Sequence, residues 1–161
     1  MDYRESLDEI RAMAGRARDG AAAAAAVVDY LHQRFPHYDW AGIYWVEGPD
    51  LVLGPWRGPE ATEHVRIPIG KGVCGAAAAS GRTELVPDVS QDPRYLQCFL
   101  STRSEVVVPI IHAGRVLGEI DIDSSTLNAF TADDQWLLEE VAALLAPRCA
   151  ARAHGAPAHG G

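Results

Sequence analysis

Hydrophobic residues recur at helical spacing near both ends of the chain. Residues 3–35 carry apolar side chains three and four positions apart, which predicts one long helix or two in sequence, ended by Pro36. Near the other end, Thr131 precedes a similar pattern and predicts a helix that runs to about Ala146. Helical segments are therefore expected on either side of a central region with a different pattern.

In that central region the apolar residues come in short runs separated by turn-forming residues, which is typical of strands. The predicted strands are residues 40–46, 51–56, 64–67, 84–86, 105–111 and 116–122. Two pairs of them are separated by short turns, which indicates hairpins and therefore an antiparallel sheet. Residues 70–81 add a turn and a helix of small residues, 76–79. The fold class is α+β, with the terminal helices on one face of the sheet and a loop-rich ligand pocket on the other.

The same pattern divides the chain into three parts. Residues 1–37 form an N-terminal helical segment, and residues 38–146 form one globular domain. The remaining residues, 147–161, are small and rich in Pro and Gly, so we expect a disordered tail.

Composition narrows the class of partner. The chain has 161 residues and a formal net charge of −8, without a Lys/Arg cluster, which argues against nucleic acid and anionic membranes. The longest apolar run, 21–28, is too short to span a bilayer, and the first residues do not resemble a signal peptide. Three widely spaced cysteines are not a secreted disulfide framework. We therefore predict a cytoplasmic protein.

Two of the three cysteines lie in contexts that favour a reactive thiol. Cys74, in the stretch HVRIPIGKGVCG, falls where a helix begins, and free backbone N–H groups there favour a thiolate. Cys98 lies near Arg94 and Arg103, whose charges would lower its pKa. The alternative for both is a buried inert thiol, which is also the interpretation we prefer for Cys149.

Acidic residues interrupt two apolar strands. Asp121 and Asp123 are two positions apart, so they share one face of a strand, and Glu105 begins the neighbouring strand. Two carboxylates that close raise the pKa of one of them, which could then act as an acid while the other binds a substrate ammonium group. The alternative is a strand end that faces water.

Aromatic residues and one histidine are less specific. Trp40 and Tyr44 share a strand face and could enclose a methyl-thioether, or they could be core residues. His64 could join Cys74 and Cys98 in a zinc site, assist a thiol, or be neutral. Because their spacing is not a zinc-finger pattern and no flavin, nicotinamide or haem motif is present, we predict neither metal nor cofactor.

Four segments, taken together, resemble the GAF domain, and within that class the free methionine-(R)-sulfoxide reductases. The segments are residues 40–44 (WAGIY), 69–75 (IGKGVCG), Cys98 followed at 104–109 by SEVVVP, and 118–124 (GEIDIDS). The resemblance covers roughly residues 38–146. It implies a single GAF-like domain, reduction of the free amino acid rather than of residues in proteins, a thioredoxin-type reductant and a homodimer.

The resemblance also implies residue roles. Cys98 falls on the family's catalytic cysteine and Cys74 on a cysteine that resolves the oxidised enzyme. Glu105, Asp121 and Asp123 fall on substrate-binding carboxylates. Trp40 and Tyr44 fall on aromatic residues that wall the pocket.

The chain departs from this family at three places. His64 stands where the family has a third cysteine, Phe99 stands where it commonly has Asp, and the loop at 59–63 is longer. Two alternatives to the enzyme therefore stay open. One is a stand-alone GAF module that senses a small molecule or redox state, and the other is a structural dimer in which Cys74 and Cys98 are buried and unreactive.

Overall fold

The computed structural model describes residues 2–96 and 101–153, except for the side chains of the last three. The helices are α1 (Tyr3–Arg16), α2 (Gly20–Arg34), α3 (Gly72–Ser80) and α4 (Ala132–Ala153), with a 3₁₀ turn at Val89–Gln91. The strands are β1 (Trp40–Glu47), β2 (Asp50–Arg57), β3 (Arg66–Pro68), β4 (Glu84–Val86), β5 (Ser104–His112) and β6 (Arg115–Ser124). Cys98 and Phe99 lie outside the described residues.

The six strands form one antiparallel sheet in the order β3-β2-β1-β6-β5-β4. The predicted hairpins are its β1–β2 and β5–β6 pairs, and β1 and β6 join them at the centre. The α+β class is confirmed. Strand β3 is the least accurately predicted, because it begins at Arg66 rather than at His64.

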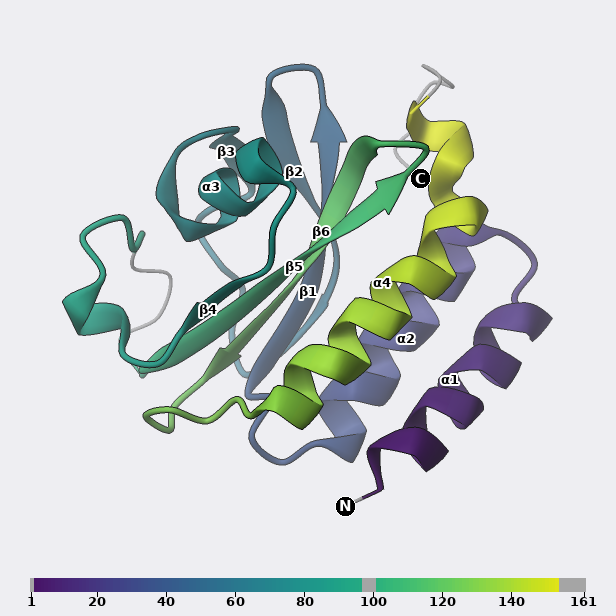
Figure 1. Ribbon diagram of the computed structural model, residues 1–161, viewed down its shortest axis with the longest axis horizontal. Helices are drawn as coiled ribbons and strands as arrows, with labels where there is room; N and C mark the ends of the chain where they lie inside the picture. The colour runs from purple at the N-terminus through teal and green to yellow at the C-terminus, as the bar shows by residue number, and fades with distance from the viewer. Residues whose placement is uncertain (1, 97–100, 154–161) are drawn as a thin grey trace.

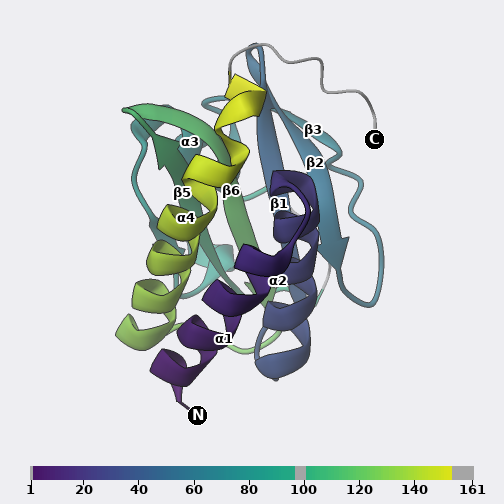
Figure 2. The ribbon, with the colours of Figure 1, turned by 90° about the vertical axis from the view of Figure 1, so that its right-hand side faces the viewer.

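Helices α2 and α4 cover one face of this sheet, and α1 packs against these two helices, as Figures 1 and 2 show. The predicted N-terminal helical segment is two helices, which begin at the side-chain caps Asp2 and Asp19. Apolar residues of all three helices share one buried cluster with the strand residues Ile120 and Ile122. The main hydrophobic core therefore lies between the helices and the sheet.

The opposite face carries helix α3 and the loops around it (Figure 1). A second, smaller apolar cluster fills the space between α3 and the strands, and it includes Trp40, Tyr44 and Val107. Because side chains alternate along a strand, Glu119, Asp121 and Asp123 of β6 point to this side, while Ile120 and Ile122 point to the main core. The main core thus lies on one face of the sheet, and the smaller apolar cluster and the acidic residues of β6 lie on the other.

Helix α4 does not end near Ala146 but continues to Ala153, so the prediction of disorder was wrong for residues 147–153. The helix passes through Pro147, which lacks an N–H group and disfavours a helix interior. Tertiary contacts oppose this cost. The Arg148 guanidinium donates to the carbonyls of Ala14 and Ala17, and Cys149 is buried among the core residues, as expected of an inert thiol.

A buried carboxylate joins α4 to α1 and to the segment before β1. Asp134, in the first turn of α4, is fully buried and accepts hydrogen bonds from the Tyr3 hydroxyl (3.0 Å), the Tyr38 hydroxyl (2.7 Å) and the His37 ring (2.8 Å). It also accepts from the backbone and hydroxyl of Thr131, the residue before the helix, so the Asp134 carboxylate rather than the predicted Thr131 side chain accepts the backbone hydrogen bond at this helix start. Burial raises the pKa of Asp134, but these hydrogen bonds outweigh it and lower the pKa to about 2.

Candidate active site

Strand β6 brings a row of carboxyl groups to the α3 side of the sheet. Glu119, Asp121 and Asp123 alternate with isoleucines, and all three side chains are at most 3% exposed. Glu105, on β5, pairs directly with Asp123 and is 4% exposed. The interpretation of these residues as a solvated strand end is therefore wrong.

Helix α3 places a thiol over this row. Gly75 allows α3 to lie close to the end of β3, because a Cβ atom there would come within 2.8 Å of the Pro68 carbonyl oxygen. The Cys74 Sγ atom lies 3.5 Å from Asp121 Oδ2 and 3.9 Å from Glu105 Oε2, within reach of an S–H···O hydrogen bond. Residues from α3, β5 and β6 thus meet in one buried cluster.

The expectation that Cys74 is a thiolate at rest was wrong. Burial, followed by the charges of Asp121, Glu119, Glu105 and Asp123, raises the pKa of the Cys74 thiol well above its ordinary value. The start of a nine-residue helix without a side-chain cap cannot offset that many carboxyl groups. Cys74 is therefore a protonated thiol at neutral pH.

Burial also raises the pKa values of the three carboxyl groups on β6. The pKa of Asp121 is raised by burial, and those of Glu119 and Asp123 are raised well above the ordinary value by burial and then by the charge of Asp121. Both oxygens of Glu119 and one oxygen each of Asp121 and Asp123 make no hydrogen bond in the described part of the chain. The cluster can hold protons and release them, which is the behaviour of a general acid.

Two predicted aromatic residues lie on the same face as the carboxyl groups. Trp40 pairs with Asp123, and its ring lies over Gly42, where an added Cβ would come within 2.4 Å of the indole. Tyr44 pairs with Glu119 and donates its hydroxyl hydrogen to the backbone oxygen of His64 at 2.8 Å. His64 thus touches this wall through its backbone, just before β3.

Cys98, the predicted nucleophile, lies outside the described residues, so its distance from Cys74 stays a prediction. Arg94, expected to act on it, binds the carboxylates of Asp92 (2.7 Å) and Glu84 (3.1 Å). Cys149 lies on the other side of the sheet, where its Sγ atom faces the Gly20 carbonyl at 3.9 Å.

Glu119 is the residue of this cluster that sequence reasoning missed. Its signal was available, because Glu119 is two positions before Asp121 and four before Asp123, and period-two spacing puts all three on one face. The sequence could not show that α3 covers this face of the sheet. Glu119 was therefore not predicted as a member of the site.

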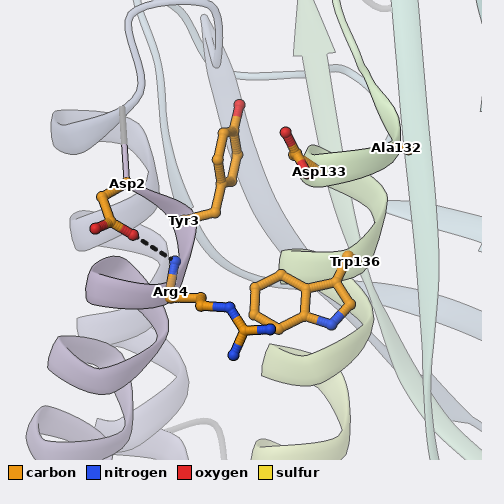
Figure 3. Close-up of a pocket in the computed structure, with 6 residues that line it drawn as sticks. All are labelled: Asp2, Tyr3, Arg4, Ala132, Asp133 and Trp136. Atoms are coloured by element: carbon orange, nitrogen blue, oxygen red, sulfur yellow. Dashed lines mark hydrogen bonds between the residues drawn. The ribbon is translucent and has the colours of Figure 1, made fainter.

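A separate hollow lies away from this cluster. Its volume is about 790 Å³, and it is lined by Asp2, Tyr3, Arg4, Ala132, Asp133 and Trp136 at the start of α1 and α4 (Figure 3). The Arg4 guanidinium lies 5.7 Å from the centre of the Trp136 ring. None of the predicted site residues lines this hollow, so it is not the site that the cysteines and carboxyl groups form.

Comparison with known proteins places this chain in a family. A family model described as the GAF domain matches residues 8–148. The chain belongs to the GAF domain family. The match includes α1 and α2 as well as the sheet. No helix in the described ranges is long and apolar enough to cross a membrane.

Among relatives, this GAF domain is 38% identical to Protein YtsP of Bacillus subtilis over 89% of the chain and 88% of that protein. It is 37% identical to free methionine-R-sulfoxide reductase of Escherichia coli, over 71% of the chain and 68% of the relative. A solved structure of free methionine-R-sulfoxide reductase from Neisseria meningitidis, in complex with its substrate, matches with a TM-score of 0.87 and 38% identity. That match covers 94% of this chain and 90% of the other.

Proposed function

We propose that this protein reduces free methionine-(R)-sulfoxide to methionine, with Cys98 as nucleophile and Cys74 as resolving thiol. The observation that carries the proposal is the convergence of Cys74, Glu105 and Asp121 in a buried cluster of carboxyl groups walled by aromatic residues. The similarity to reductases of this name supports it.

The chemistry balances with two thiols. The Cys98 thiolate attacks the sulfoxide sulfur while a neighbouring carboxyl group protonates the oxygen. The hydroxyl then passes from the substrate sulfur to the Cys98 sulfur as the transient S–S bond breaks, which leaves methionine and a Cys98 sulfenic acid. Condensation with the Cys74 thiol forms a disulfide and releases water. A thioredoxin-type dithiol then reduces the disulfide.

The charges on the site favour this division of roles between the cysteines. The raised pKa of Cys74 makes it a poor nucleophile for the first step. In the second step it must lose a proton, and the Asp121 carboxylate oxygen is 3.5 Å away to accept it. The same cluster of acids suits a resolving thiol better than an attacking one.

The carboxyl cluster also offers a reason for choosing the free amino acid. Carboxylates in a water-poor site bind an ammonium group strongly, and only a free amino acid carries one next to its α-carbon. A methionine sulfoxide inside a polypeptide has an amide there, which would leave buried carboxylates without a counter-charge. We therefore assign ammonium recognition to Glu105, Asp121 and Asp123.

The alternative is a GAF module that binds a small molecule or senses redox state without catalysis. It is favoured by His64, which stands at the position of the family's third cysteine, and by Phe99 next to Cys98. Such a module would be stabilised against heat by its ligand while consuming none of it.

The deciding experiment follows both epimers of free methionine sulfoxide in the presence of dithiothreitol. We expect loss of the R epimer alone, and no loss above background with Cys98→Ser. Cys149→Ala is the matched control, because that thiol lies on the helix side of the sheet, and it should keep the activity. Stabilisation by the R epimer without any consumption would favour the sensing module instead.

A further inference from the structure

Three atoms of metal-binding type meet in the buried cluster. They are Cys74 Sγ, one carboxylate oxygen of Glu105 and one of Asp121, and all of them lie within 4.8 Å of one another. Each comes from a different element, α3, β5 or β6, and all three residues are buried. Sequence spacing could not reveal this set, because the residues are far apart along the chain.

The separations suit a small thiophilic dication. Zinc bonds of about 2.3 Å to sulfur and about 2.0–2.2 Å to oxygen, at a tetrahedral angle, place sulfur and oxygen about 3.5–3.7 Å apart. The Cys74 Sγ atom lies 3.5 Å from the Asp121 oxygen and 3.9 Å from the Glu105 oxygen. Both separations are close to those that a tetrahedral zinc ion would set.

A second, independent observation points to a missing counter-charge. Asp121 Oδ1, Asp123 Oδ1 and both oxygens of Glu119 are buried, and none makes a hydrogen bond within the described ranges. Each of these side chains is at most 3% exposed. Buried carboxyl groups are ordinarily hydrogen-bonded, paired with a charge or bound to a metal. A dication would supply what the protein does not.

We propose that Cys74, Glu105 and Asp121 bind a divalent thiophilic cation such as Zn²⁺, and that the bound ion closes the site to its organic ligand. The ion would take the Cys74 sulfur and two of the carboxylates that we assign to the substrate ammonium. Binding of the ion does not depend on the proposed reductase activity. Only the inhibition rests on that function.

The test uses the reduced, full-length protein and Co²⁺ as a coloured substitute for zinc. A cobalt–thiolate bond gives an intense charge-transfer absorption band, which carboxylates alone do not. We expect this band in the unmodified protein and in Cys149→Ala, and we expect Zn²⁺ to bleach it by displacement. The band should disappear in Cys74→Ser while Cys98→Ser retains it.

A second variant guards against a folding defect in Cys74→Ser. Asp121→Asn keeps the thiol and a side chain of the same size, and it should lower the affinity for Zn²⁺ by about tenfold or more. Absence of the band in the unmodified protein, its survival in Cys74→Ser, or an unchanged affinity in Asp121→Asn would overturn the proposal.

Activity supplies a separate readout. Zn²⁺ at concentrations that bleach the cobalt band should abolish consumption of the R epimer, and a chelator should restore it. Undiminished turnover with zinc bound would overturn the inhibitory role. A metal-free protein that binds cobalt but consumes no sulfoxide would instead contradict the proposed function and leave the metal site standing.

Discussion

Asp134 and Asp121 are both buried acids, yet they lie on opposite sides of one sheet in opposite surroundings. Asp134 accepts hydrogen bonds from two tyrosines, a histidine and Thr131, and its pKa falls to about 2. Asp121 has a thiol at 3.5 Å and an oxygen without a hydrogen bond in the described chain, and burial raises its pKa. The acid with many donors is a structural element, whereas the acid without them is poised to exchange protons or bind a cation.

The difference extends to the two layers. On the helix side, apolar side chains of α1, α2 and α4 fill the space above the sheet. On the α3 side, a smaller apolar cluster adjoins a row of buried carboxyl groups, and Cys74 of α3 contacts two of them. Natural proteins depart from good packing and hydrogen bonding mainly at functional sites, so stability and function are expected to respond in opposite ways to changes on the two faces.

The largest effect is expected at Asp121. Asp121→Asn keeps the shape of the side chain but removes its charge and its ability to exchange a proton, so kcat/KM for the R epimer should fall on the order of a thousandfold. The melting temperature should not fall, because a buried acid with a raised pKa gains little from its charge. Steady-state kinetics and thermal unfolding of the same preparation check both statements. Asp121→Asn with most of its activity would contradict the assigned role.

The opposite result is expected at Asp134. Asp134→Ala leaves the hydroxyls of Tyr3 and Tyr38 and the ring of His37 without their acceptor, which should lower the free energy of unfolding by about 3 kcal/mol. Urea unfolding measures this loss. Its neighbour Asp133 is exposed, so Asp133→Ala is the matched control and should change stability by about 0.5 kcal/mol or less. Equal losses in the two variants would break the comparison.

Acid should separate the two faces as well. The folded pKa of Asp134, about 2, lies below its ordinary value of 3.8, so its contribution is present above pH 3.8 and is lost as the pH falls towards 2. The loss should be roughly 2 kcal/mol, and Asp134→Ala should lack it. The test measures the free energy of unfolding of the unmodified protein and of Asp134→Ala. It runs from pH 5 down to the lowest pH at which both fold, in steps of about half a pH unit. Parallel curves would contradict the assignment.

Glu119 should give the smallest change, and of opposite sign. Its folded pKa is raised well above 4.5 by burial, so its destabilising effect is absent below pH 4.5 and grows as the pH rises through the folded pKa. Glu119→Gln cannot ionise, and near neutral pH it should unfold with a free energy about 1 kcal/mol higher. Glu140→Gln, on the exposed side of α4, is the control and should change little. A loss of stability in Glu119→Gln would show that the ionised carboxylate is satisfied.

Much of the fold could be predicted from hydrophobic spacing. The hairpins, the strand at Glu84–Val86 and the helices at both ends follow from periods of two and 3.6 residues. The end of α4 could not be predicted, because composition and Pro147 favour a stop there. Arg148, in the continued part of the helix, donates hydrogen bonds to the carbonyls of Ala14 and Ala17. These contacts with α1 depend on the tertiary structure, which the local sequence does not show.

Sequence reasoning named most residues of the candidate site but did not predict the pKa of its thiol. Alternation along β6 placed Asp121 and Asp123 together, strand order placed Glu105 beside them, and the resemblance implied that Cys74 belongs to the same site. The helix-start argument for a Cys74 thiolate failed because it considered one element alone. The carboxyl groups that raise the pKa of the Cys74 thiol come from two other strands, β5 and β6. The sequence does not show that they lie next to Cys74 in space. Glu119 was missed for the same reason.

The central claim is that the carboxyl cluster on the α3 side recognises a free amino acid by its ammonium group. The most direct measurement compares kcat/KM for free methionine-(R)-sulfoxide with that for its N-acetyl derivative, which differs in that group. We predict a preference for the free form on the order of a hundredfold or more, lost in Asp121→Asn. Equal rates with the two compounds, or no consumption of either, would contradict the claim.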